Sequence, residues 1–120
     1  MSQNFNTYYF AYGSNLNVER LKKRNVSFNK NLSAMIKDYK LVFNKIASKN
    51  PNLERYANII KTKNSIVEGI LYQITRDSLQ ELDKHEGFPN HYNRYEKEIL
   101  IKSTGEIVKA WVYIANQGTH

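Results

Sequence analysis

The sequence YFAYGSNL, residues 9–16, joins a run of aromatic and apolar residues directly to Gly-Ser-Asn. Apolar residues at successive positions occupy both faces of an extended chain, so residues 8–12 are predicted to form a short strand buried on both sides. The following segment, Asn17-Val-Glu-Arg-Leu-Lys-Lys-Arg, is typical of a helix with an asparagine N-cap, and Leu16 and Leu21 occupy the positions of a hydrophobic staple. This part of the sequence therefore predicts a strand, a tight loop and a helix.

The length and the composition set the class of protein. A chain of 120 residues without cysteine is expected to be one domain, residues 1–120, with a core that needs no disulfides. The absence of cysteine fits the reducing cytoplasm. The N-terminal residues lack the pattern of a signal peptide, and no apolar run approaches the ~18 residues of a membrane span. We therefore expect a soluble, cytoplasmic protein that does not enter a membrane.

The chain is basic, with 18 Lys and Arg against 11 Asp and Glu and a formal net charge of +7. A nucleic-acid-binding protein usually concentrates its basic residues on one face or along one element. Here the lysines are scattered from Lys22 to Lys109, and only Lys22, Lys23 and Arg24 are adjacent. A solvated basic surface without specific nucleic-acid binding is therefore favoured, and a basic nucleic-acid-binding domain is the alternative.

The other elements follow from alternating apolar residues and from turn and cap signals. Thr75 is the expected N-cap of a second helix, residues 75–85, and Asp77 lies in its favourable first turn. A hairpin turn is predicted at residues 103–105, and a loop at residues 48–52. The predicted strands are residues 8–12, 39–44, 55–62, 65–74, 94–102 and 106–115. This order predicts an α+β fold with one mixed, barrel-like sheet and two or three short helices.

The loop after the first strand has two interpretations. Gly13 allows a ligand to approach the backbone closely, and the free amides of a helix N-terminus attract an anion or a polarised carbonyl. The alternative is a simple connecting turn in which Ser14 and Asn15 bond to their own backbone.

The stretch LDKHEG, residues 82–87, adds a candidate catalytic group. Leu79, Leu82 and Glu86 lie at positions i, i+3 and i+7, which share one helix face. Glu86, or failing it Asp83, is therefore expected to point inward, where burial and the negative end of the helix dipole raise the pKa of a carboxyl group. Such a group exchanges protons near neutral pH. In the alternative interpretation the helix frays at His85 and Glu86 points into solvent.

These motifs together resemble one enzyme family. YFAYGSNL, the Glu-Arg pair at 19–20, DYKLVF at 38–43, EGILYQI at 68–74 and LDKHEG at 82–87 occur in the same order in γ-glutamylcyclotransferases. The resemblance covers roughly residues 8–115. It implies a small barrel-like sheet flanked by helices, and a cofactor-independent enzyme that cyclises a γ-glutamyl group to 5-oxoproline and releases the attached amine.

The resemblance also implies roles for individual residues. It assigns substrate binding to four residues around the first loop: Tyr12, Gly13, Ser14 and Asn15. It assigns the general acid/base to Glu86, and pocket positions to Tyr92 and Tyr113. A metal site is not expected, because His85, His91 and His120 lack the spacing and the acidic companions of zinc ligands.

Three points stay open at this stage. PNHYNR, residues 89–94, resembles the branch that acts on γ-glutamylamines, whereas YFAYGSNL resembles the branch that acts on γ-glutamyl amino acids, so the leaving group is not assigned. Many relatives continue beyond the position of His120, and a second copy of the chain in a homodimer would be one way to complete the site. Arg20 and Arg94 are either substrate contacts or packed, ion-paired side chains. A non-catalytic protein that binds a γ-glutamyl ligand is the alternative to an enzyme.

Overall fold

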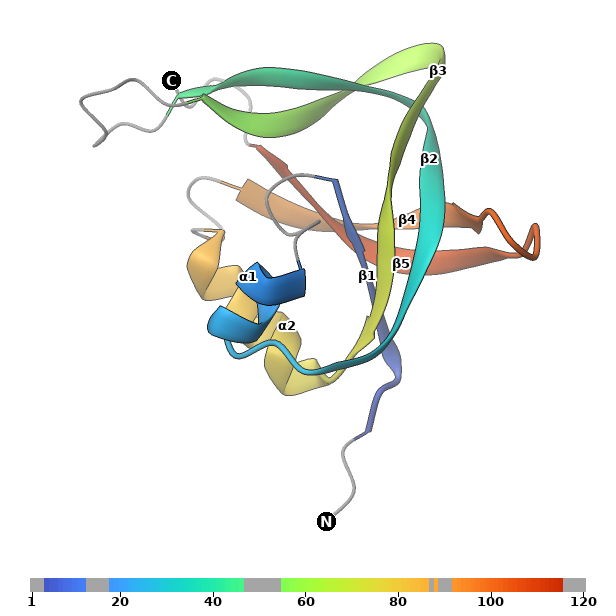
Figure 1. Ribbon diagram of the computed structural model, residues 1–120. Helices are drawn as coiled ribbons and strands as arrows, with labels where there is room; N and C mark the ends of the chain where they lie inside the picture. Colours follow the sequence, from blue (N-terminus) through green and yellow to red (C-terminus); the bar gives the residue numbers. More distant parts are fainter. Residues whose placement is uncertain (1–3, 13–17, 47–54, 87, 89–91, 116–120) are drawn as a thin grey trace.

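A computed structural model of the chain describes residues 4–12, 18–46, 55–86, 88 and 92–115. Within these residues, five strands form a closed barrel in the order β1-β3-β2-β4-β5, and two helices lie side by side outside it (Figure 1). The predicted α+β class and barrel-like sheet are therefore confirmed. The elements are β1 (Thr7–Ala11), α1 (Val18–Lys23), β2 (Phe28–Ile46), β3 (Arg55–Ile74), α2 (Arg76–His85), β4 (Tyr92–Ile101) and β5 (Ile107–Ala115).

β1 is buried on both faces, as its unbroken apolar sequence predicts. It pairs with β3 in antiparallel and with β5 in parallel orientation, through Tyr9↔Tyr72 and Tyr9↔Trp111. Phe10 packs inside the barrel with Ile36, whereas Tyr9 packs in a second cluster that includes the helix residues. Successive side chains of a strand point to opposite faces, so β1 separates the two clusters of the core.

The longest strands differ from the prediction. The predicted strands 55–62 and 65–74 are one strand, β3, and β2 begins at Phe28 rather than near Tyr39. The interruption seen in the sequence is a bulge, in which Asp38 and Asn64 both have positive φ and the Asp38 carboxylate accepts the Asn64 N–H at 3.0 Å. The bulge lets the paired strands continue as a curved arm (Figure 1).

The arm also corrects an expectation about burial. Leu41 and Phe43 were expected on the half-buried face of a strand, but they are 38% and 58% exposed. They lie beyond the bulge, where β2 has left the wall of the barrel and pairs only with β3. The alternation predicted the strand correctly, but it did not predict what covers that strand.

Local signals placed both helices correctly. Thr75 caps α2 and accepts the N–H of Ser78 at 3.1 Å, and the Ser78 hydroxyl accepts the N–H of Ser27 at 2.7 Å. The latter bond joins the start of α2 to the segment that follows α1. Leu21 and Leu82 are fully buried in the same cluster, so the two helices pack on one side of the sheet. The proposed cap Asn17 and staple residue Leu16 lie outside the described residues.

Candidate active site

The candidate site lies at the C-terminal end of α2. The helix ends at His85, and Glu86 follows with φ −87° and ψ −2°, its N–H bonded to the carbonyl of Leu82 at 2.9 Å. His85 is exposed, whereas Glu86 is partly buried. The backbone thus keeps a helical conformation one residue beyond the helix, and the expectation that Glu86 points inward fits this geometry better than a frayed end does.

Burial raises the pKa of Glu86 to about 7, and the positive charge of Arg24 acts in the opposite direction. Removing a carboxylate from water disfavours its charged form, while a nearby cation stabilises it. Here the effect of burial is larger. Glu86 is therefore able to accept and to return a proton near neutral pH.

Tyr12 stands beside this carboxyl group. It follows β1, is only 8% exposed, and donates its hydroxyl hydrogen to the backbone carbonyl of Tyr113. The pKa of Tyr12 is raised above its ordinary value by burial and, to a smaller extent, by Tyr92, Glu86 and Tyr9. These electrostatic effects require proximity. The structure therefore brings Tyr12, Tyr92 and Glu86 together from three separate parts of the chain.

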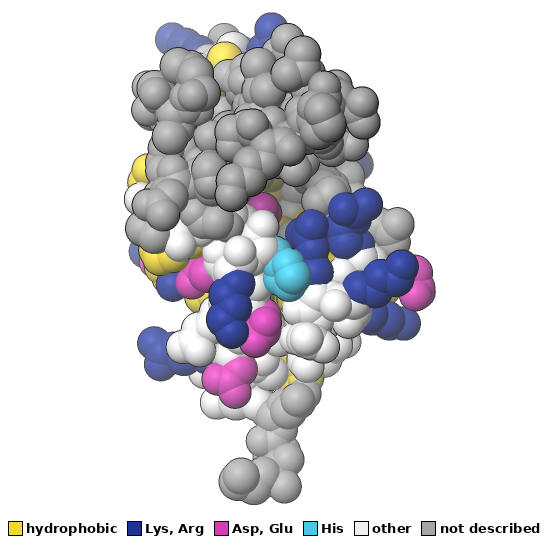
Figure 2. Space-filling view, turned by 90° about the vertical axis from the view of Figure 1, so that its left-hand side faces the viewer, with side chains coloured by type: hydrophobic (Ala, Val, Ile, Leu, Met, Phe, Trp, Pro, Cys, Tyr) yellow, Lys and Arg dark blue, Asp and Glu magenta, His cyan; other side chains and the backbone are white. Residues whose placement is uncertain are grey.

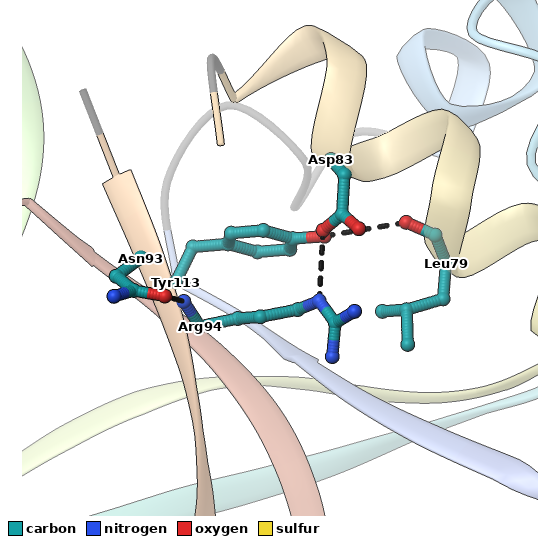
Figure 3. Close-up of polar contacts among 5 residues, drawn as sticks. All are labelled: Leu79, Asp83, Asn93, Arg94 and Tyr113. Atoms are coloured by element: carbon teal, nitrogen blue, oxygen red, sulfur yellow. Dashed lines mark hydrogen bonds and ion pairs between the residues drawn. The ribbon is translucent and has the colours of Figure 1, made fainter. Parts of the chain in front are cut away.

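The two other candidate tyrosines have partners within the protein. Tyr92, the first residue of β4, donates to the carbonyl of Ala57 at 2.8 Å. Tyr113, in β5, donates to the Asp83 carboxylate at 2.6 Å, and its oxygen lies 3.4 Å from the carbonyl oxygen of Leu79 (Figure 3). A hydroxyl has one hydrogen to donate, so the Tyr113 hydroxyl is already engaged as a donor.

Arg94 is ion-paired within the protein. Its Nε lies 2.8 Å from Oδ1 of Asp83, and the two side chains are only 22% and 16% exposed. Of the two interpretations that the sequence left open, the structure therefore favours the packed arginine for Arg94. Asp83 is correspondingly paired with Arg94 and Tyr113. Arg20 is exposed.

The sequence did not indicate the role of Arg24, whose positive charge lowers the pKa of Glu86. Lys22, Lys23 and Arg24 form a visible basic run at the end of α1, but the sequence does not indicate which of them faces α2. Arg24 is partly buried, whereas both lysines are exposed. On the face of the molecule that carries the helices, basic and acidic side chains are interspersed (Figure 2).

Other expected site residues lie outside the described residues. These are Gly13, Ser14 and Asn15 of the first loop, and His91. The described chain approaches that loop through β1 and resumes at α1. Within the described ranges, no group of three or more His, Cys, Asp or Glu side chains is placed to hold a metal ion. Neither described helix is long and apolar enough to cross a membrane.

Comparisons with known proteins agree with this architecture. Residues 9–120 match the family described as "Gamma-glutamyl cyclotransferase, AIG2-like". The chain is 36% identical over 81 residues to a gamma-glutamylcyclotransferase of Bos taurus, a match that covers 66% of this chain and 43% of the bovine protein. A gamma-glutamylcyclotransferase of Homo sapiens is 35% identical over 81 residues, with the same coverage. The chain thus matches less than half the length of these relatives.

The similarity extends to a solved structure. A protein described as "Gamma-glutamyl cyclotransferase" superposes with a TM-score of 0.79 at 26% sequence identity, covering 92% of this chain and 66% of that chain. Nearly all of the present chain therefore has a counterpart in that structure.

Proposed function

The chain belongs to the gamma-glutamyl cyclotransferase, AIG2-like family, and on this premise we propose that it cyclises a γ-glutamyl group to 5-oxoproline and releases the attached amine or amino acid. The observation that carries the proposal is the carboxyl group of Glu86, which has a pKa of about 7 and stands beside Tyr12. A carboxyl group buried without a function costs stability. In a cyclotransferase, a carboxyl group with this pKa would accept and return the protons of the reaction.

The proposed reaction needs few groups from the protein. The α-amine of the γ-glutamyl group attacks its own δ-carbonyl carbon, and a five-membered ring closes. The bond between that carbon and the leaving nitrogen then breaks. Holding the substrate in a folded conformation makes the attack intramolecular, which is worth ~7 kcal/mol or more when the geometry is well held. The protein therefore has to fix the substrate conformation and transfer protons.

Glu86 is proposed to carry out both proton transfers. As a carboxylate it accepts the proton that the attacking amine loses, and as a carboxylic acid it returns a proton to the leaving nitrogen. A group whose pKa lies near the working pH is suited to both steps. Its neighbour Arg24 keeps part of the population ionised, since its charge lowers the pKa that burial raises.

Backbone amides of residues 13–15 are the proposed binding groups for the substrate. They would hold either the α-carboxylate or the oxyanion that develops on the δ-carbonyl. Tyr12 supports this proposal indirectly, because its hydroxyl bonds to the Tyr113 carbonyl and fixes the end of β1 from which the loop departs. The proposal therefore assigns Tyr12 to positioning and the loop to binding.

Glu86→Gln tests the proposal directly. The substitution keeps the shape but removes the proton acceptor, so formation of 5-oxoproline should fall by about 10²–10⁴-fold. The substrates to assay are γ-glutamyl amino acids, γ-glutamylamines and glutathione, with binding followed by calorimetry. Glu81→Gln is the matched control, because Glu81 lies on the same helix and pairs on the surface with Lys84.

The outcomes separate an enzyme from a binding protein. Lost turnover with retained binding in Glu86→Gln, and normal turnover in Glu81→Gln, would support catalysis by Glu86. Binding without 5-oxoproline formation from any substrate by the unmodified chain would instead indicate a non-catalytic γ-glutamyl-binding protein. Near-normal turnover in Glu86→Gln would remove Glu86 from the mechanism.

A further inference from the structure

Two neighbouring strands hold the same oxygen atom of α2. Arg94 of β4 and Tyr113 of β5 are directly paired across the sheet. Both donate to Oδ1 of Asp83, Arg94 through Nε at 2.8 Å and Tyr113 through its hydroxyl at 2.6 Å (Figure 3). Asp83 lies three residues before Glu86, one helical turn away. The last turn of α2 is therefore attached to the sheet through one carboxylate.

The guanidinium group of Arg94 also lies close to two aromatic rings. The guanidinium carbon of Arg94 lies 4.5 Å from the ring centre of Trp111 and 5.1 Å from that of Phe88. Phe88 follows Glu86 by two residues, and its N–H bonds to the Asp83 carbonyl at 2.9 Å. Stacking of this kind restricts a side chain that otherwise has many rotamers. The chain is thus held just before and just after Glu86.

The negative charge of Asp83 is unfavourable at this end of the helix unless a partner compensates it. A carboxylate in the last turn of a helix faces the negative end of the helix dipole, which destabilises it. The partly buried Arg94 compensates this charge, and exposed pairs such as Lys102–Glu68 contribute little by comparison. Tyr113 stays protonated at neutral pH, because burial and the bond to Asp83 raise its pKa. It is therefore a permanent donor.

We propose that Asp83, Arg94 and Tyr113 form a positioning cluster that fixes the turn carrying Glu86 and so holds its carboxyl group at the reacting atoms of the substrate. This inference rests on the proposed function of Glu86. It also gives Tyr113 a different role from the one that the family resemblance implied. Its hydroxyl acts through Asp83 rather than on the substrate.

Disruption of the positioning cluster should change the pKa of Glu86. The described groups whose charge acts on or responds to this carboxyl are Arg24, which directly follows α1, and Tyr12, which directly follows β1. Neither belongs to the cluster. If the turn loosens, Glu86 gains water, and its pKa should fall from about 7 toward the ordinary value of 4.5. The cluster therefore acts on the pKa through position rather than through its own charge.

Two charge-conserving variants test this role. Tyr113→Phe removes one hydrogen bond to Asp83, and Arg94→Lys keeps the positive charge but loses the planar group that stacks on Trp111 and Phe88. The measurement is a carbon NMR titration of the Glu86 carboxyl, assigned by the missing signal of Glu86→Gln. Both variants should lower the pKa by about one unit or more. Ile36→Val, inside the barrel, controls for a general loss of stability and should leave the pKa unchanged.

Kinetics gives a second measurement on the same proteins. A positioning role predicts a lower kcat with KM near the wild-type value, and an acidic limb of the pH profile that moves with the measured pKa. A raised KM with an unchanged pKa of Glu86 in both folded variants would overturn the inference and return Tyr113 to substrate binding. A wild-type chain that forms no 5-oxoproline would overturn the proposed function instead, so the two failures are distinguishable.

Discussion

The hydroxyl of Tyr92 donates a hydrogen bond of 2.8 Å to the backbone carbonyl of Ala57, which joins the first residue of β4 to the arm formed by β2 and β3. A second bond, from the N–H of Ala115 to the side-chain oxygen of Asn58 at 2.9 Å, lies beside it. Asn58 is buried, as is Tyr92. These two bonds therefore attach the arm to the first residue of β4 and to the last residue of β5, near the residues that surround Tyr12.

Tyr92→Phe should therefore reduce the stability of the folded chain, whatever its effect on turnover. The substitution removes this donor from the partly buried Ala57 carbonyl, and loss of one such hydrogen bond costs about 1 kcal/mol. Urea unfolding at neutral pH measures the loss. Tyr95→Phe on the same strand is the control, since Tyr95 is 43% exposed. Equal unfolding midpoints for Tyr92→Phe and the wild type would contradict the fastening role.

The ionisation of Glu86 predicts a pH-dependent stability. Its pKa is about 7 in the folded chain against 4.5 ordinarily, so between these values the folded state binds more protons than the unfolded state. The contribution of this group to stability is thus fully present below pH 4.5 and is lost as pH rises through 7. Glu86→Gln removes this dependence and should be more stable than wild type at alkaline pH by roughly 3 kcal/mol.

Denaturant unfolding of both proteins across this pH range measures the difference. The gap between Glu86→Gln and wild type should widen with rising pH and close in acid, while Glu81→Gln follows the wild-type curve. A gap that stayed constant with pH would mean that Glu86 is not buried as described.

Arg24→Met should raise the pKa of Glu86 above 7. Arg24 lowers that pKa through its charge, and methionine keeps an unbranched side chain without the charge. The carboxyl titration and the acidic limb of the activity profile should both move to higher pH. Lys23→Met removes one charge from the exposed neighbouring position and should cause a smaller shift. Equal shifts in the two variants would indicate a long-range charge effect rather than a specific contact.

Gly69→Ala, in β3, should disrupt the neighbouring strand β1. A Cβ at this position would lie 2.2 Å from the carbonyl oxygen of Ala11 and 2.8 Å from Cζ of Phe10. Neither backbone nor buried ring can move freely, so we expect a loss of about 3 kcal/mol or an unfolded chain. Gly105→Ala is the comparison, since nothing lies within 4 Å and only its positive φ of 75° opposes the change. That variant should lose about 1 kcal/mol.

Much of the fold followed from local patterns in the sequence. The buried strand at β1, the Thr75 cap of α2 and the hairpin between β4 and β5 each depend on residues within a few positions of one another, and each was predicted correctly. The spacing from Leu79 and Leu82 also predicted that Glu86 faces inward; its partial burial just after α2 is consistent with this, and its catalytic role stays a prediction. Local geometry and side-chain periodicity are properties that a sequence carries directly.

The tertiary structure decided what each of these groups contacts. Tyr12 and Tyr113 are 101 residues apart in the chain and meet only because β1 and β5 are neighbours in the barrel. β3 is one strand where two were predicted. Leu41 and Phe43 are exposed because they lie beyond the bulge at Asp38. The pairing of Arg94 with Asp83 and the position of Arg24 near Glu86 likewise depend on how helices dock on the sheet. Such contacts depend on closure of the barrel and on helix docking, which no short stretch of sequence specifies, whereas Glu86 was selected as the catalytic candidate from the sequence alone.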